Sequence, residues 1–279
     1  MRRILIILLL GMLGVFGLSA LGMYGLTRGY FETVPPHPQE PESPVLNTTT
    51  ALPATAELEL LARTDPVAFL RACLLRYRKE VRGYQCTLLK MERLNGKVGP
   101  VETIGVTFRE EPFSVLLAWR SSPAGMADRA LYVAGENGGK ALARGKILHL
   151  VHHRDPYSAD AMSASRIALP EFGMAKGTER TLAAWEHAAA RGSLKVNYLG
   201  VRPVAEAGGV PCYVLRRTCD PPEEDGVVTI DMSFDVAHWL QVGNALTAGG
   251  NQPIAAYYFR DIVLNPEFAA GQFDARAMK

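Results

Sequence analysis

The stretch ETIGVTFR, residues 102–109, decides the fold of this chain together with FSVLLAWR, residues 113–120. In each stretch apolar side chains recur at every second position, and this period of two places them on one face of a β-strand. In the second stretch Ser114, Ala118 and Arg120 take the other face. Sequential strands with one apolar face are typical of antiparallel sheets, so the pair must bury that face under another layer. The apolar face consists of Ile104, Val106, Phe108, Val115, Leu117 and Trp119.

Further strands extend this meander. In Tyr84–Leu94 the alternation fails at Leu88-Leu89, which predicts a bulge or a strand buried on both faces. Asn95-Gly96 favours a turn, in a loop that we expect to run to Pro100. About ten strands are expected and no βαβ rhythm is present, so the fold class is antiparallel α+β. The other predicted strands are Leu131–Ala134, Lys140–Ala143, Leu194–Leu199, Val210–Arg217, Val227–Phe234 and Ala255–Leu264.

Two helices are predicted. In the first, Asp65 is a suitable N-cap, Pro66 fits the first helical position, and Gly83 suits the C-terminal cap. We expect its apolar stripe to cover the apolar face of the meander. The stripe consists of Val67, Leu70, Leu74, Tyr77 and Val81. The second helix is predicted to begin at a Thr178 cap and to end at Gly192. One side of it carries Leu182, Trp185 and Ala189.

The first 29 residues predict export. Arg2-Arg3 precede the apolar run Ile4–Leu26, which at about 1.5 Å per residue can cross a hydrocarbon core of about 30 Å. It is either an uncleaved signal anchor or a signal peptide cleaved near Ala20-Leu21-Gly22. The body, residues 56–279, is then anchored to the inner membrane on its periplasmic side, or secreted to the periplasm. Residues 30–55 form a Pro/Thr-rich linker.

Composition excludes some function classes. The 279 residues are 48% hydrophobic and 21% charged with a formal net charge of +2, and no basic stripe with interleaved aromatics is present. We therefore expect no nucleic-acid partner. The sequence has no nucleophile elbow, phosphate-binding glycine loop or dinucleotide fingerprint, so no cofactor is expected and a non-enzymatic role is favoured.

Two clusters carry metal-ligating residue types. The first is His149, His152 and His153 with Asp155, an order that lacks the helical pair and glutamate of zinc hydrolases. The second is an acidic turn whose spacing does not match a calcium loop, so a solvated hairpin tip is favoured there. That turn contains Asp220, Glu223, Glu224 and Asp225. We expect no metal at either cluster.

The four cysteines can pair in an exported protein. Cys212 and Cys219 lie on one predicted strand, about 23 Å apart at about 3.3 Å per residue, which is beyond disulfide reach. Cys73 and Cys86 flank the reversal at Gly83 and meet if the strand folds back along the helix. A Cys86–Cys212 bridge across the sheet and buried free thiols are the other two interpretations.

The chain resembles an exported bacterial family, domain-of-unknown-function family 1571. The resemblance covers residues 66–273 and is carried by YQCT (84–87), KMERLNGK (90–97), LYV (131–133) and NGGK (137–140). More distantly, Tyr258–Pro266 and Val228–Asp231 resemble closing strands of the LolA/LolB-like lipoprotein-carrier superfamily. That resemblance implies a strongly curved antiparallel half-barrel, with an N-terminal helix and one or two further helices on its concave face. Superfamily members bind acyl chains in an apolar cavity or serve as binding modules.

Three functions follow as hypotheses. The first is a non-enzymatic envelope protein that binds a lipid, lipoprotein or other hydrophobic ligand, with the apolar face from Ile104 to Trp119 lining a cavity. The second is an interaction module of an envelope complex, in which the same face is a filled core and exposed sheet edges do the recognition. The third is an envelope metal-dependent hydrolase that uses His152, His153 or the acidic turn.

Overall fold

The computed structural model describes residues 51–121 and 127–279, and all of these described residues fall within one compact unit, Val45–Lys279. All of its buried apolar core lies between Leu58 and Met278, so this unit contains its own core. The predicted apolar run Ile4–Leu26 and most of the predicted linker lie outside the described residues. None of the helices in the described ranges has the length and hydrophobicity needed to cross a bilayer.

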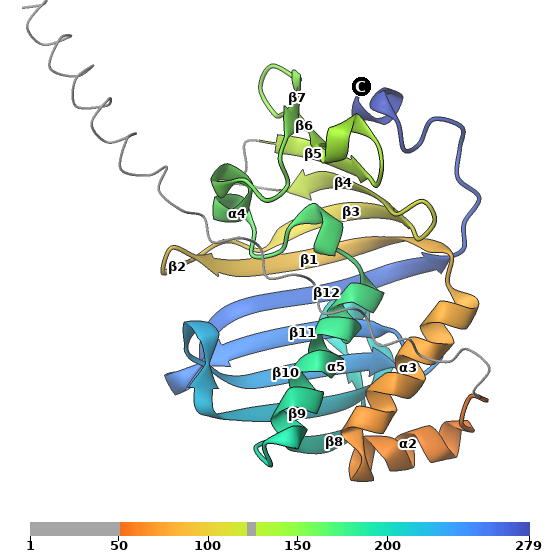
Figure 1. Ribbon diagram of the computed structural model, residues 1–279, viewed down its shortest axis with the longest axis vertical. Helices are drawn as coiled ribbons and strands as arrows, with labels where there is room; N and C mark the ends of the chain where they lie inside the picture. The colour runs from red at the N-terminus through yellow and green to blue at the C-terminus, as the bar shows by residue number, and fades with distance from the viewer. Residues whose placement is uncertain (1–50, 122–126) are drawn as a thin grey trace, which may run out of the picture. The chain divides into compact units, whose positions relative to one another are not determined.

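In the described part of the chain, twelve strands form one curved, open antiparallel sheet (Figure 1). Its order is β7-β6-β5-β4-β3-β1-β12-β11-β10-β9-β8, with β2 paired only to β1. This confirms the predicted α+β half-barrel, with three strands that the sequence analysis did not identify: β2, β7 and β11. The strands are β1 (Gly83–Leu94), β2 (Lys97–Val98), β3 (Glu102–Arg109), β4 (Ser114–Ser121), β5 (Ala127–Val133), β6 (Ala141–Gly145), β7 (Val151–Arg154), β8 (Lys195–Val204), β9 (Val210–Glu223), β10 (Val227–Asp235), β11 (Gln241–Ala248) and β12 (Gln252–Leu264).

The helices lie on one side of this sheet. Figure 1 shows α3 and α5 in front of the half formed by β12 to β8, and α4 in front of the other half. The α-helices are α2 (Thr55–Thr64), α3 (Pro66–Glu80), α4 (Ala159–Ala164) and α5 (Met174–Ala190). Helices α2 and α4 were not predicted. Short 3-10 turns complete the chain at η1 (Asn137–Gly139), η2 (Leu169–Glu171), η3 (Ala205–Ala207), η4 (Glu224–Gly226), η5 (Gly249–Asn251) and η6 (Ala275–Met278).

The predicted start of α3 is confirmed and its predicted end is wrong. The Asp65 side chain accepts a hydrogen bond of 2.9 Å from the amide of Ala68, and Pro66 opens the helix. The helix ends at Glu80, and Gly83 is the first residue of β1 rather than a cap. A Cβ on Gly83 would lie 2.6 Å from the carbonyl oxygen of Phe108. Glycine is required there because β1 passes close to β3.

The predicted position of the α3 stripe is only partly correct. Tyr77 and Val81 pack in the meander core, whereas Leu70 and Leu74 pack against the opposite half of the sheet. There they share a core with Trp185 of α5. Most of α3 therefore covers β9 and β10, and the meander face depends on other residues for its cover. The core on that side also contains Phe69, Tyr213, Leu215, Met232, Phe234 and Trp239.

Three local predictions also change. Asn95 and Gly96 both have positive φ, 50° and 75°, and they close a two-residue hairpin between β1 and β2, not a long loop. The irregularity in β1 lies between Gln85 and Thr87, where the register with β12 shifts, rather than at Leu88-Leu89. Helix α5 begins at Met174, so Thr178 lies inside it, and Ala188 rather than Ala189 is buried.

Candidate hydrophobic cavity

A cavity of about 1040 Å³ lies between the concave face of the sheet and its cover. The cover consists of α4, the segment 165–173 and one side of α5. This volume is at the upper end of the range for small-molecule sites, which are typically concave and mostly apolar with a few polar groups. Among the residues of the apolar wall, Trp119, Phe172, Ile230, Leu246 and Phe259 are partly exposed. Others lie at the wall but are at most 6% exposed: Leu88, Ile104, Leu117, Met174, Trp185 and Met232.

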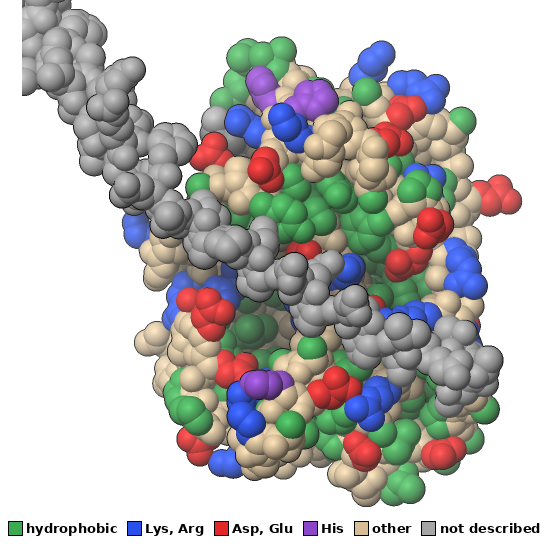
Figure 2. Space-filling model, in the orientation of Figure 1, with side chains coloured by type: hydrophobic (Ala, Val, Ile, Leu, Met, Phe, Trp, Pro, Cys, Tyr) green, Lys and Arg blue, Asp and Glu red, His purple; other side chains and the backbone are tan. Residues whose placement is uncertain are grey.

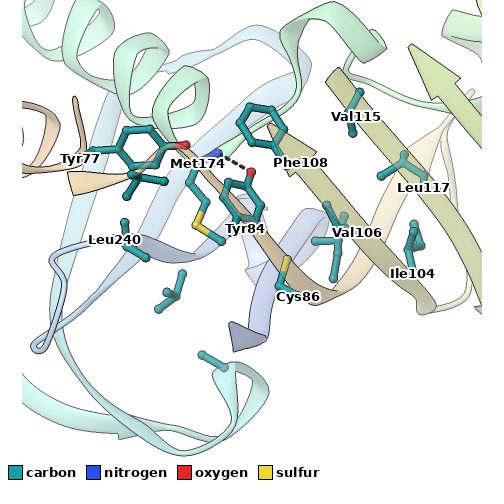
Figure 3. Close-up of a cluster of buried hydrophobic side chains, with 14 of the residues drawn as sticks. Tyr77, Tyr84, Cys86, Ile104, Val106, Phe108, Val115, Leu117, Met174 and Leu240 are labelled. Carbon is teal, nitrogen blue, oxygen red and sulfur yellow. Dashed lines mark hydrogen bonds between the residues drawn. The ribbon is translucent and has the colours of Figure 1, made fainter. Parts of the chain in front are cut away.

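The structure separates the six predicted cavity residues into two groups. Ile104, Leu117 and Trp119 line the cavity. Val106, Phe108 and Val115 do not line it; they are at most 3% exposed in the meander core (Figure 3). One half of the predicted apolar face is therefore cavity wall and the other half is packed core. The cavity interpretation describes the end that contains Ile104 and Trp119, and the filled-core interpretation describes the end that contains Phe108 and Val115.

The packed end is filled by aromatic contacts. Phe108 stacks on Tyr84 with ring centroids 4.7 Å apart and meets Phe113 edge-on at 5.3 Å. The amide of Met174 donates to the Tyr84 hydroxyl at 3.3 Å (Figure 3). A Cβ on Gly173, whose φ is +128°, would lie 3.2 Å from the Phe108 ring. The start of α5 thus closes this end of the face.

The open end has small side chains where the packed end has aromatic rings. Four alanines on β5 and β6 line the cavity there. Empty space beside apolar residues forfeits dispersion contacts, so such a void in a close-packed fold favours a ligand or solvent. The alanines are Ala127, Ala130, Ala141 and Ala143.

A row of polar side chains crosses the cavity floor. Strand pairing places Lys90 of β1 beside Glu102 of β3 on one side and Tyr257 of β12 on the other, and Tyr257 beside Asn244 of β11. All four line the cavity. The Lys90 ammonium lies 2.9 Å from a Glu102 oxygen and 3.2 Å from a Glu92 oxygen. We refer to Glu102, Lys90, Glu92, Tyr257 and Asn244 as the polar row.

Glu92 connects the floor to the cover. It is 4% exposed, and its Oε1 accepts from the Tyr257 hydroxyl at 2.6 Å and from the Arg166 amide at 3.2 Å. Ser165 Oγ lies 3.5 Å from the same oxygen. Burial, and then the adjacent Glu92 carboxylate, raise the pKa of Tyr257, so its hydroxyl remains a donor. The carboxylate holds the segment between α4 and α5 against the sheet.

Two buried polar atoms on this floor have no hydrogen-bond partner within the described part of the chain. They are Arg217 Nε and Asn244 Oδ1. Arg217 is 4% exposed, and its Nη2 contacts Glu223 Oε1. Leaving such groups unpaired costs stability, and neither atom is exposed to the cavity space in this structure.

Sequence analysis did not identify the polar row, although one signal was present. The even positions of β1 continue one face from Tyr84 through Leu88 to Lys90 and Glu92, and all of these are buried. Two opposite charges that extend an apolar strand face indicate a buried ion pair. The pairing with Glu102 and Tyr257 depends on strand register between distant segments, which the local pattern does not reveal.

The two candidate metal clusters do not assemble. His152 and His153 are adjacent on the exposed edge strand β7, where successive side chains point to opposite faces. In the acidic turn, Asp220 pairs with Lys195 at 3.0 Å. Asp225 pairs with Arg166 at 2.6 Å. Within residues 51–121 and 127–279, no three histidine, cysteine or acidic side chains are grouped to hold a metal ion.

The four cysteines are buried free thiols. Cys73 lies in the core beneath α3, whereas Cys86 and Cys212 lie in the meander core. Of the three interpretations left open by the sequence, the structure has buried free thiols, and neither the Cys73–Cys86 nor the Cys86–Cys212 bridge is formed. Cys73 and Cys86 separate because α3 lies over β9 and β10 rather than along β1. Burial raises the pKa of Cys212 to about 12, so this thiol is unreactive at neutral pH.

These features define a class: an α+β half-barrel with an internal, mostly apolar cavity. The chain belongs to the family described as "Protein of unknown function (DUF1571)", whose model matches residues 81–278. This confirms the resemblance that the sequence motifs indicated. A comparison with curated proteins found no match.

Several solved structures are similar to this chain at low identity. The lipoprotein LppX of Mycobacterium tuberculosis is 11% identical, with 74% of this chain and 100% of that chain covered and a TM-score of 0.41. The LolA superfamily protein NE2245 of Nitrosomonas europaea is 8% identical, with 75% and 98% covered and a TM-score of 0.35. The MucA/MucB complex of Pseudomonas aeruginosa is 16% identical, with 77% and 62% covered and a TM-score of 0.45.

Proposed function

We propose that this protein binds a lipid or another amphiphilic hydrophobic ligand in the cavity, as a non-enzymatic protein of the cell envelope. The observation that supports the proposal is the cavity itself, about 1040 Å³ with a mostly apolar wall and a polar row on its floor. Further charged side chains, among them Arg154, Asp160 and Arg180, also line it. Burial of each methylene of an acyl chain contributes about 0.8 kcal/mol, so a chain along the apolar wall binds measurably.

The polar row selects the polar part of the ligand. Lys90 is one ammonium between two carboxylates, Glu92 and Glu102, so these three side chains carry an excess of one negative charge. Arg217 is paired with Glu223. An anionic headgroup at the row would face this excess negative charge in a low-dielectric site, which is costly. An uncharged hydroxyl, ester or amide group brings no net charge and can exchange hydrogen bonds with the exposed atoms of the polar row. We therefore infer a neutral amphiphile rather than an anionic phospholipid.

We infer the location from the N-terminal sequence. The basic residues before Ile4–Leu26 support an extracytoplasmic body, anchored to the inner membrane or released to the periplasm. Lipids and lipoproteins are the hydrophobic partners available there. The proposal includes no cofactor, metal or nucleic acid.

A titration with matched variants tests this proposal. The Val45–Lys279 unit is titrated with a fluorescent acyl amphiphile that has an uncharged headgroup. We expect Ala143→Phe, which places a ring in the cavity, to weaken binding at least tenfold. Ala118→Phe is the control, because residue 118 follows the cavity residue Leu117 on β4 and faces the opposite side of the sheet. Equal binding by the two folded variants, or no binding by the parent, contradicts the proposal.

Displacement of the fluorescent probe by competing lipids distinguishes an uncharged headgroup from an anionic one. Monoacylglycerol is expected to displace the probe at lower concentration than phosphatidylglycerol. The reverse order would leave a lipid site in place and remove the inference of a neutral ligand.

A further inference from the structure

The hairpin that joins β6 and β7 carries a concentrated apolar tip. Ile147 is 78% exposed, Leu148 74%, Leu150 54% and Val151 43%. Elsewhere in the described ranges, exposed large hydrophobic residues do not gather in this way; Val263 on β12, for example, lies alone. Single exposed aliphatic residues are ordinary, whereas a contiguous group marks an interaction surface.

The base of the hairpin holds this tip away from the body. The Gly145 amide donates to the Leu150 carbonyl at 2.9 Å, which closes the loop, and Arg144 pairs in register with Val151. The Arg144 guanidinium binds Asp128 through two hydrogen bonds of 2.8 and 2.7 Å. The aliphatic side chains are therefore displayed on an anchored hairpin and do not fold back onto the core.

Basic and titratable side chains surround the tip. Residues 144–154 contain Arg144, Lys146 and Arg154, three histidines and no acidic residue. The neighbouring carboxylate Asp128 is already paired with Arg144 and lies 3.5 Å from His149. Figure 2 shows apolar surface at the end of the body where Figure 1 places this hairpin, with histidine and basic side chains directly beside it.

We propose that Lys146–Val151, the hairpin tip, docks on a bilayer surface that contains anionic lipid. Aliphatic side chains enter the acyl boundary while the basic side chains remain at the headgroups, an arrangement that combines apolar burial with electrostatic attraction. Ala141, Ala143 and Arg154 of the same hairpin line the cavity. Docking therefore places one cavity wall at the membrane surface. The docking site itself does not depend on whether the cavity holds a ligand.

Vesicle co-sedimentation of the Val45–Lys279 unit tests this proposal, because this unit lacks the apolar run Ile4–Leu26. We expect binding to vesicles of phosphatidylcholine mixed with phosphatidylglycerol, and weaker binding to phosphatidylcholine alone. The variant I147S/L148S is expected to bind at least about tenfold more weakly. The burial of two aliphatic side chains in the bilayer contributes more binding free energy than a tenfold change in affinity requires. The control V201S/V263S changes two isolated exposed valines and should bind like the parent.

A site-specific probe provides the second readout. The native cysteines are at most 6% exposed, so Leu148→Cys can be labelled selectively with an environment-sensitive fluorophore. We expect a blue shift on addition of anionic vesicles, and none from a label at Val263→Cys. Parent-like vesicle binding by I147S/L148S together with an unshifted label at position 148 overturns the proposal, and points to a protein partner for this tip.

Discussion

The two ends of β3 are built alike and used differently. At one end Phe108 is 1% exposed and lies between Tyr84, Phe113 and the start of α5. At the other end Ile104 is also 1% exposed, yet it faces a cavity with alanines on β5 and β6. Burial alone does not distinguish core from cavity wall; the size of the opposing side chains does.

The largest expected effect separates these two ends. We predict that Phe108→Ala lowers the free energy of unfolding by about 3–5 kcal/mol, because the stacked and edge-on rings cannot collapse into the space. Trp119→Ala removes a half-buried ring that faces existing empty volume, so its cost should be clearly smaller. Urea denaturation of both variants measures the difference. Equal losses would show that the open end is packed as tightly as the closed end.

The polar row gives the next effect. Lys90→Met leaves the Glu92 and Glu102 carboxylates without their common cation, and we expect a loss of about 3 kcal/mol, as for other broken buried pairs. The triple variant K90M/E92Q/E102Q should recover much of this stability, because no buried charge is then unpaired. Thermal unfolding of the two variants provides the measurement. A triple variant no more stable than K90M would show that the charges act independently.

A smaller effect is expected at the first turn of α3, outside both ends of β3. Asp65→Ala removes the side-chain acceptor for the Ala68 amide and should cost about 1 kcal/mol. Asp65→Asn retains a side-chain acceptor for the Ala68 amide, so it should lower the stability less than Asp65→Ala does. Chemical denaturation compares the two, and ligand binding should not change in either. A change in binding would show that α3 position controls the cavity.

The smallest effect concerns pH at the packed end. Burial is the main cause that raises the pKa of Glu110 above its ordinary value of 4.5, and a hydrogen bond from Tyr77 partly opposes it. A carboxyl whose folded-state pKa is raised holds its proton more tightly when folded, so its contribution to stability falls as pH rises from 4.5 to the folded value. Glu110→Gln should remove that component. We expect the free energy of unfolding of E110Q, relative to that of the parent, to increase between pH 4 and pH 7. If the difference between the two proteins stays constant with pH, Glu110 is not a carboxyl with a raised pKa in the folded state.

Local patterns predicted most of the fold because the relevant signals lie within one strand or helix. The alternation in residues 102–109 and the Asp65-Pro66 cap both correspond to observed elements. The edge strand β7 was missed because its four residues are all exposed and carry no alternation. The position of α3 was misjudged because its stripe matches either half of the sheet, and only packing with α5 decides between them.

The site was predictable only in part. Three of its apolar residues follow from strand alternation, whereas the small residues that leave the space open, such as Ala130 and Ala143, carry no local signal. The polar row depends on the β1–β12 register, which joins segments more than 160 residues apart, such as Lys90 and Tyr257. Long-range pairing of this kind is absent from any local sequence window.

Native mass spectrometry with lipid extraction, on protein purified from an exported preparation, tests the central claim most directly. We predict one amphiphile per protein chain with an uncharged headgroup, and its loss from the Ala143→Phe variant while Ala118→Phe retains it. A mass corresponding to protein alone, with no uptake of added fatty acid, acylglycerol or phospholipid, would contradict a ligand-binding cavity and favour the interaction-module hypothesis.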